Sequence, residues 1–186
     1  MNETLRTIAA RRSVRAYRPE QIGPEELQAI LEAGRFAPSG MGQQAWHFSV
    51  VQRKELLDRI NEACREGFLR SGNKVFEERA RAEGFSVFYG APTLIVVSGD
   101  EQALTTVENC ALALGNMFLA AASLGVGSCW IHAVKFIFDG ADGKALAAEL
   151  ALPPGYRVYA SGAFGYPAAG LPDAAPRREG TVTIIR

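Results

Sequence analysis

The chain has 186 residues, 48% of them hydrophobic and 22% charged, which is ordinary for one globular domain that buries a core. Its 20 basic and 20 acidic residues give a net charge of zero, so overall charge argues against binding to nucleic acid or an anionic membrane. The cysteines, Cys64, Cys110 and Cys129, form no disulfide framework, and the first residues lack the apolar run of a secretory signal. We therefore expect one cytoplasmic domain over residues 1–186, without a membrane segment.

The first half of the chain predicts helices that alternate with loops and one strand. Pro24 opens a helix with Glu25 and Glu26 in its first turn, and Pro38 ends that helix near Ala37. In chain order, the expected elements are a short helix over 2–10, a loop over 11–18, the helix over 24–37, a strand over 46–51, an amphipathic helix over 54–65 and a charged helical stretch over 66–84.

The second half adds buried strands and one long apolar helix. Residues 92–98 are apolar on both faces, as in a strand that is covered on both sides. Residues 101–124 form the longest predicted helix, which Gly125 would end in a left-handed conformation. Because this helix is apolar nearly all round, we expect a second subunit to cover part of it. The remaining expected elements are strands over 128–132, 157–164 and 181–185 and a helix over 144–150.

A group of arginines follows the first predicted helix. Arg11, Arg12, Arg15 and Arg18 lie within eight residues, with Ser13 among them. Guanidinium groups bind phosphate through paired hydrogen bonds, and a serine hydroxyl adds a neutral donor. The spacing therefore allows an anion site, although an ordinary solvated loop would have the same composition.

A second segment, residues 37–48, joins a helix to a strand. Ser39, Gly40 and Gly42 would let a ligand approach the backbone closely, and Gln43 and Gln44 offer amide groups to the edge of a heterocycle. An ordinary connecting loop remains the alternative.

The glycines near residue 125 do not form a dinucleotide-binding motif. Gly125 and Gly127 follow a helix rather than a strand, and Trp130 occupies the third glycine position. Cys129 and His132 have no supporting cluster of metal ligands, so we expect no metal site. Since no catalytic triad or carboxylate pair is visible either, a bound cofactor that carries the chemistry itself is favoured.

Taken in order, these segments resemble the nitroreductase family, and the resemblance covers nearly the whole chain. The matching motifs are Arg11-Arg12-Ser13-Val14-Arg15, Ala37-Pro38-Ser39, Gln43-Gln44-Ala45-Trp46-His47-Phe48, Gly90-Ala91-Pro92, the Ala-rich helix with Asn116, the run from Leu124 to Ile131, Leu152-Pro153-Pro154-Gly155-Tyr156, Gly165-Tyr166-Pro167 and a basic tail. Two positions depart from the family pattern: Gly42 stands where Asn is usual, and Ala45 where Pro is usual.

The resemblance implies an α+β fold, a three-layer α/β/α arrangement around a mostly antiparallel sheet, with the C-terminal segment extended onto a partner subunit. It implies a homodimer with FMN in the interface. One subunit would contribute Arg11 and Ser13 at the phosphate, Arg15 near the N1–O2 edge of the flavin, and the backbone of residues 131–133 near N5. The full set of implied flavin contacts is Arg11, Arg12, Ser13, Arg15, Ile131, His132, Ala133, Arg177 and Arg178, with Pro38, Ser39, Met41 and Gln43 from the other subunit.

The implied activity is an FMN-dependent oxidoreductase. NADH or NADPH would deliver hydride to the flavin, and a small acceptor such as a nitroaromatic or a quinone would then take the nicotinamide's place in a ping-pong exchange. Alternatives are a flavin-fragmenting enzyme, a reductive dehalogenase, a non-catalytic flavin-binding protein or an anion- or nucleic-acid-binding module built on residues 11–18. Asn73 and Lys74 are candidates for a polar pair of the family, and His132 would lie over the substrate cavity.

Overall fold

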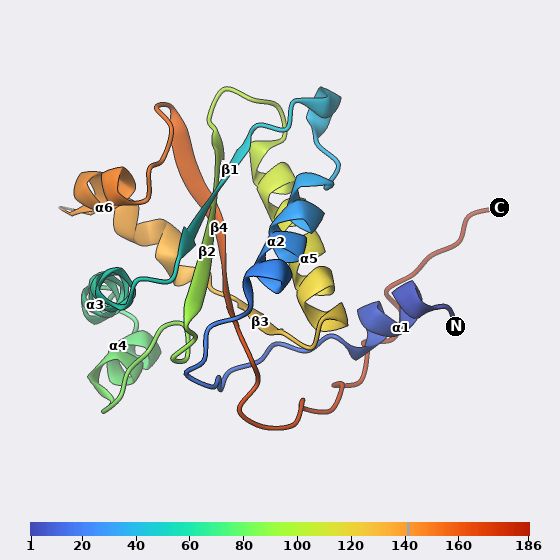
Figure 1. The fold of residues 1–186 in the computed structure, drawn as a ribbon, viewed down its shortest axis with the longest axis horizontal. Coiled ribbons are helices and arrows are strands. Elements are labelled where there is room, and N and C mark those ends of the chain that lie inside the picture. Colours follow the sequence, from blue (N-terminus) through green and yellow to red (C-terminus); the bar gives the residue numbers. More distant parts are fainter. Residues whose placement is uncertain (141) are drawn as a thin grey trace.

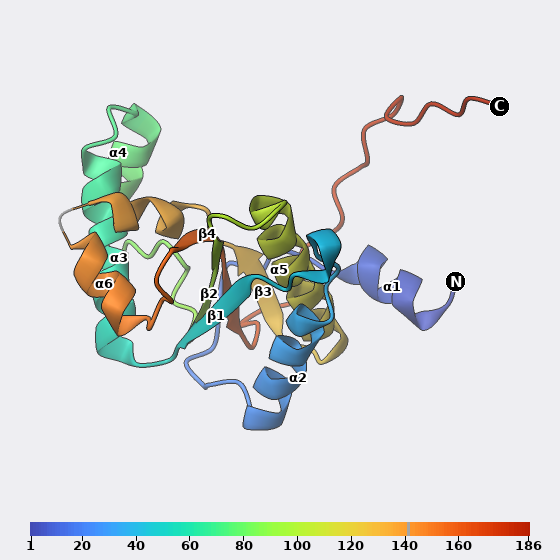
Figure 2. The same ribbon diagram turned by 90° about the horizontal axis from the view of Figure 1, so that it is seen from above.

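The computed structural model describes residues 1–140 and 142–186, which form a four-stranded sheet between two layers of helices (Figures 1 and 2). The elements in chain order are α1 (Glu3–Ala10), α2 (Pro24–Arg35), the 3-10 turn η1 (Gly40–Gly42), β1 (Trp46–Val51), α3 (Lys54–Leu69), α4 (Lys74–Arg81), β2 (Thr93–Asp100), α5 (Thr106–Ser123), β3 (Gly127–Trp130), the 3-10 helix η2 (Ala133–Asp139), α6 (Gly143–Glu149) and β4 (Tyr156–Gly165).

The sheet has the strand order β1-β2-β4-β3, and each neighbouring pair is antiparallel. The central strand β2 is buried on both faces because helices cover each side, as its continuous apolar run predicts. Ile95 and Val97 pack with α2 and α5, whereas Leu94 and Val96 pack with α3, η2 and α6. The α/β/α arrangement and the antiparallel sheet are therefore confirmed.

Helix α5 lies close against the sheet and against α2. Its polar residue Asn116 donates from Nδ2 to the carbonyl of Ala33 in α2 at 3.1 Å, which satisfies an amide in an otherwise apolar helix. Part of α5 stays uncovered in the single chain: Val107 is 56% exposed and Leu112 is 48% exposed. One chain thus leaves apolar side chains of α5 exposed, and their cover by a second subunit stays a prediction.

Two predicted helix boundaries were wrong. Residues 101–105 form a turn, and α5 starts at Thr106, because Thr105 adopts a left-handed conformation and the Thr106 hydroxyl donates to the carbonyls of Asp100 and Ala103. The charged stretch 66–84 is two helices rather than one. α3 continues to Leu69, and Asn73 then caps α4 by accepting from the N–H groups of Val75 and Phe76.

The predicted strand over 181–185 does not form in the single chain. Beyond β4 the tail leaves the body and runs out past α1 (Figures 1 and 2). Its alternating apolar residues Val182 and Ile184 are exposed, and no strand of the sheet lies beside them. A strand needs a neighbour for its backbone hydrogen bonds, and the tail has none among residues 1–140 and 142–186.

No helix within the described residues combines the length and the apolarity that a bilayer crossing requires.

Candidate functional site

The arginine segment lies along strand β3. Ser13 forms a parallel bridge with Ser128, and the Val14 N–H donates to the Ser128 carbonyl at 2.9 Å. Val14 points into the protein and is buried, so the side chains on either side of it turn outward. This pairing fixes Arg11, Ser13 and Arg15 beside the end of β3.

Cys129 marks the point at which the positive side chains converge. Burial raises the pKa of its thiol, and this effect is opposed, in decreasing order, by Arg15, a hydrogen bond with Ser13, Arg11 and Arg79. The positive charges of Arg15, Arg11 and Arg79 thus favour negative charge at Cys129. An anion bound beside the arginine segment would gain from the same charges.

Tyr89 links the arginine segment to α4. The guanidinium carbon of Arg15 lies 5.9 Å from the centre of the Tyr89 ring, and that of Arg79 lies 5.3 Å from it. Tyr89 has a φ of 59°, a left-handed conformation that costs a non-glycine residue energy and that is common at functional sites. Sequence reasoning missed both Tyr89 and Arg79, although Tyr89 directly precedes the Gly90-Ala91-Pro92 motif.

Arg12 has a different role from its neighbours. Its guanidinium donates to the carbonyls of Ala9 at 2.7 Å, Arg11 at 2.8 Å and Pro172 at 3.2 Å. These bonds join the end of α1 to the start of the tail. Arg12 thus anchors the start of the tail through Nε and Nη1, and its predicted contact with a ligand stays a prediction.

The segment after β3 offers free backbone donors at two of its three predicted residues. The Ile131 N–H donates to the Ser161 carbonyl at 2.9 Å, and the Ile131 carbonyl accepts from the Ser161 hydroxyl at 2.6 Å. Both backbone groups of Ile131 are therefore used by the sheet. His132 and Ala133 follow at the start of η2, where the first N–H groups of a helix have no intrahelical partner.

Aromatic side chains surround His132. Trp130 stacks on it with ring centres 6.5 Å apart, and Phe136 meets it edge-on at 5.4 Å. Burial lowers the pKa of His132, and the nearby Lys135 lowers it further. Both effects favour the neutral imidazole at neutral pH.

A cavity of about 730 Å³ opens beside these residues, between the α3–α4 hairpin and the β3–η2 segment. This volume suits a small organic molecule. The aromatic residues in its lining are Phe68, Phe76, Tyr89, Trp130, His132 and Phe136. The folding of α3 and α4 over this site was not predicted from the sequence, because their charged residues are typical of ordinary surface helices.

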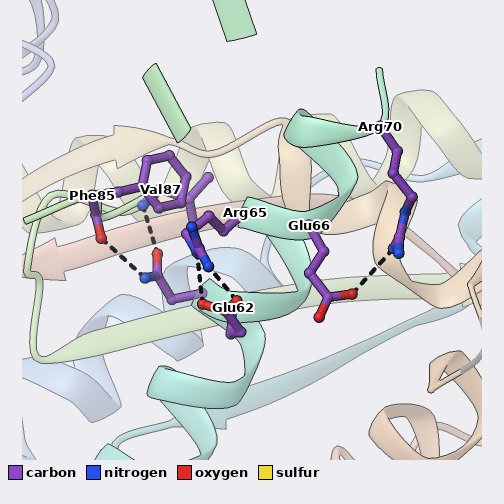
Figure 3. Close-up of polar contacts among 7 residues, drawn as sticks. Glu62, Arg65, Glu66, Arg70, Phe85 and Val87 are labelled. Carbon is purple, nitrogen blue, oxygen red and sulfur yellow. Dashed lines mark hydrogen bonds and ion pairs between the residues drawn. The ribbon is translucent and has the colours of Figure 1, made fainter. Parts of the chain in front are cut away.

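One side chain of α3 holds the hairpin in place. Asn61 donates to the Phe85 carbonyl at 3.1 Å and accepts from the Val87 N–H at 2.8 Å, which ties the segment after α4 to α3. Figure 3 shows Phe85 and Val87 beside α3, together with the surface pairs Glu62–Arg65 and Glu66–Arg70. Asn73, by contrast, caps α4, and neither it nor Lys74 lines the cavity.

The loop with Pro38, Ser39, Met41 and Gln43 lies at the opposite end of α5 from the arginine segment. The Gly40 N–H donates to Asn109 in the first turns of α5 at 3.0 Å, and Gln43 Oε1 accepts from the Leu104 N–H at 3.0 Å. Helix α5 has 18 residues, which corresponds to a length of about 27 Å. One chain therefore does not bring these two predicted groups together.

The same loop is shaped for contact with something outside the chain. Met41, Gly42 and Gln44 all have positive φ values, and Met41 is 87% exposed. The Ser39 hydroxyl accepts from the Gln44 N–H at 3.0 Å, which stabilises the turn.

Arg177 and Arg178 lie in the exposed tail and contact neither the cavity nor the arginine segment. Arg177 donates only to the nearby Ala175 carbonyl, at 3.2 Å, within the described part of the chain. In the single chain these two residues thus stand apart from the other predicted site residues.

Comparison with known proteins gives consistent matches over the length of the chain. The model of the nitroreductase family matches residues 8–166. An Archaeoglobus fulgidus protein provisionally named NADH dehydrogenase/NAD(P)H nitroreductase is 32% identical over 173 residues, which cover 90% of this chain and 87% of that protein. Two crystal structures of FMN-bound nitroreductases superpose over the full length of both chains: that from Bacteroides fragilis with a TM-score of 0.93 and 42% identity, and that from Desulfitobacterium hafniense with 0.92 and 32%.

Proposed function

Because the chain belongs to the nitroreductase family, we propose that it binds FMN and uses it to pass hydride from NADH or NADPH to a small acceptor such as a nitroaromatic or a quinone. FMN supplies the hydride chemistry, so the protein's part is to bind, orient and stabilise charge. The observation that carries this proposal is the placement of the arginine segment along β3, with Arg15 against Tyr89 in the wall of the aromatic cavity.

The residues present suit the two ends of FMN. A phosphate near neutral pH carries between one and two negative charges. Arg11 would bind it through a cationic guanidinium, and Ser13 through a neutral hydroxyl. Arg15 would lie by the N1–O2 edge of the ring, where a cation stabilises the charge that reduction adds. Of the residues after β3, His132 and Ala133 would face N5, because the backbone of Ile131 is already bonded to Ser161.

We also propose that the working unit is a homodimer. The arginine segment and the loop over 38–43 lie at opposite ends of α5, so a second copy must supply the other half of each flavin site. Two further observations support this. The apolar side chains of α5 that stay exposed would be covered by a partner, and the extended tail would carry Arg177 and Arg178 onto the partner's flavin.

The nicotinamide and the acceptor would use the aromatic cavity in turn. Flat rings pack well against Tyr89, Trp130 and Phe136, and the volume of the cavity leaves room for one such molecule beside the flavin. Alternating occupation of one space gives ping-pong kinetics.

The experiment is a visible spectrum of the purified protein, followed by NADH or NADPH under anaerobic conditions. Bound flavin absorbs at roughly 370 and 450 nm, and bleaching of these bands by either nucleotide is the expected result. A protein that stays colourless after FMN is supplied contradicts the proposal. A yellow protein that does not bleach is a non-catalytic flavin-binding protein or one of the specialised relatives that act by other chemistry.

The shared site has its own test, by mixing two defective chains. Arg11→Ala removes one half of a site and Gln43→Ala weakens the other half, so a mixed dimer holds one intact site and one doubly defective site. Mixed dimers should then recover about half of the FMN content of the unaltered protein. Mixed dimers with no more FMN than either variant alone would show that the site lies within one chain.

A further inference from the structure

Among the described residues, the lining of the aromatic cavity holds two basic and two acidic side chains, and only two of these four pair with each other. Arg70 pairs with Glu66 at 3.2 Å, so these two largely cancel. Arg79 lines the same cavity, and within the described part of the chain its side chain contacts the Tyr89 ring but forms no ion pair. Asp142 is the remaining acidic residue of the lining, and it belongs to the segment between η2 and α6 rather than to α4.

The region around Arg79 is electropositive beyond its own charge. The guanidinium carbons of Arg79 and Arg15 lie 5.3 Å and 5.9 Å from the centre of the same Tyr89 ring, so a second cation lies near Arg79. A ligand with a positive group would be repelled there, whereas a negative group would gain attraction from both cations.

Arg79 is also well placed to bind a planar anion. Its guanidinium lies over the Tyr89 ring, which restricts its orientation without using its N–H donors on an acid. A guanidinium held in this way can donate two parallel hydrogen bonds to a carboxylate, an interaction that an ammonium group cannot reproduce.

We propose that the cavity selects flat aromatic acceptors that carry a carboxylate, with Arg79 as the residue that binds the carboxylate. The aromatic walls hold the ring, and Arg79 at the α4 side fixes its orientation. The inference rests on the proposed function, since it names the class of acceptor that the flavin site reduces. For 4-nitrobenzoate, one NAD(P)H and one proton convert the nitro group to a nitroso group, with release of NAD(P)⁺ and water.

The test compares two acceptors of equal shape, 4-nitrobenzoate and neutral 4-nitrobenzamide, in the FMN-loaded enzyme. The quantity measured is the ratio of their kcat/KM values. Arg79→Gln should lower this ratio about tenfold, because a charge-assisted hydrogen bond contributes at least that factor. Arg79→Lys should recover only part of it. The matched control is Arg81→Gln on the same helix, whose arginine pairs with Glu77 outside the cavity and which should leave the ratio within about twofold.

A second readout is independent of turnover. Calorimetric titration with benzoate and benzamide, which are not reduced, should show that Arg79→Gln weakens benzoate binding about tenfold and benzamide binding much less. Equal losses for both compounds, or no loss for either, would overturn the proposal, since Arg79 would then serve only to support Tyr89. A rise in the KM for NADPH without an effect on benzoate would also overturn it, because the anion recognised would be a phosphate of the nucleotide. Failure of the proposed function would appear separately, as a flavin that NAD(P)H does not bleach.

Discussion

Arg15 and Tyr89 meet across 74 positions of sequence, with the guanidinium carbon of Arg15 5.9 Å from the centre of the tyrosine ring. Arg79 lies over the same ring at 5.3 Å. Tyr89 therefore orients one arginine beside strand β3 and another above the aromatic cavity. The left-handed backbone at Tyr89 is consistent with a residue whose position matters more than its conformational energy.

Replacing Arg15 with Ala should make the bound flavin harder to reduce. The cation that compensates the added negative charge is lost, so the reduction potential of bound FMN should fall by about 30 mV or more, which corresponds to roughly 1.4 kcal/mol for a two-electron couple. Tyr89→Leu should lower the potential in the same direction but less, because Arg15 remains and only its orientation is lost. Equilibration with reference dyes measures both, and an unchanged potential in Arg15→Ala would rule out this placement of Arg15.

Removing the two tail arginines should weaken cofactor binding without unfolding the protein. In Arg177→Ala/Arg178→Ala, each charge-assisted bond to the phosphate contributes about 1.5–3 kcal/mol, so the Kd for FMN should rise at least tenfold. Both residues are exposed in the single chain, which is why the melting temperature of the cofactor-free protein should stay the same. Fluorescence titration with FMN provides the measurement. Arg186→Ala in the same tail is the control, and equal effects of the two variants would argue for general electrostatics.

Loss of Asn61 should loosen the wall of the cavity. Asn61→Ala leaves the Phe85 carbonyl and the Val87 N–H without their partner, at a cost of about 1–3 kcal/mol. Amide hydrogen exchange at Val87 should become faster while exchange in β2 stays slow. Asn61→Asp keeps the acceptor for the Val87 N–H, so its exchange rate at Val87 should lie between those of the unaltered protein and Asn61→Ala. Slow exchange at Val87 in Asn61→Ala would mean that packing alone holds this segment.

Stability should fall in alkaline solution through the buried thiols. Burial raises the pKa of Cys64 from 9.0 to about 12, so the folded state keeps the thiol neutral while the unfolded chain ionises. The stabilisation is complete below pH 9 and is lost as pH rises towards 12, by at most about 1.4 kcal/mol per pH unit for one thiol. Urea unfolding at several pH values measures this slope. Cys64→Ala should lower the slope, leaving the part due to Cys110, whose pKa burial also raises to about 12. Equal slopes would assign the pH dependence to other groups.

Local signals in the sequence predicted most of the secondary structure. Pro24 with its acidic first turn marked the start of α2, and Gly125 ended α5 with a φ of 75°. The apolar run before Ser98 marked the central strand. These helix and strand signals depend on residues that are adjacent in the sequence, so the sequence alone predicts them. The start of α5 was missed because Thr105 takes a left-handed conformation, which is uncommon for a β-branched residue and cannot be predicted from its side chain.

The site was only partly readable, because its parts come from distant elements. The arginine segment was recognisable from its composition, and the pairing of Ser13 with Ser128 places that segment beside β3. Arg79 looked like any surface residue of a charged helix, and only the folding of α4 over the cavity gives it a role. Arg12 has a contact that the sequence did not predict: its guanidinium donates to three backbone carbonyls and joins the end of α1 to the tail.

The length of α5 has a consequence for how the protein behaves on dilution. The arginine segment and the loop over 38–43 stand at opposite ends of this helix, so each proposed flavin site exists only while two chains are joined. Specific activity should then depend on enzyme concentration and fall when dilution separates the chains. Added FMN should counteract that loss by mass action, since it binds the paired form. FMN binding and the association of two chains would thus be linked equilibria. A cell short of FMN would hold more separated chains.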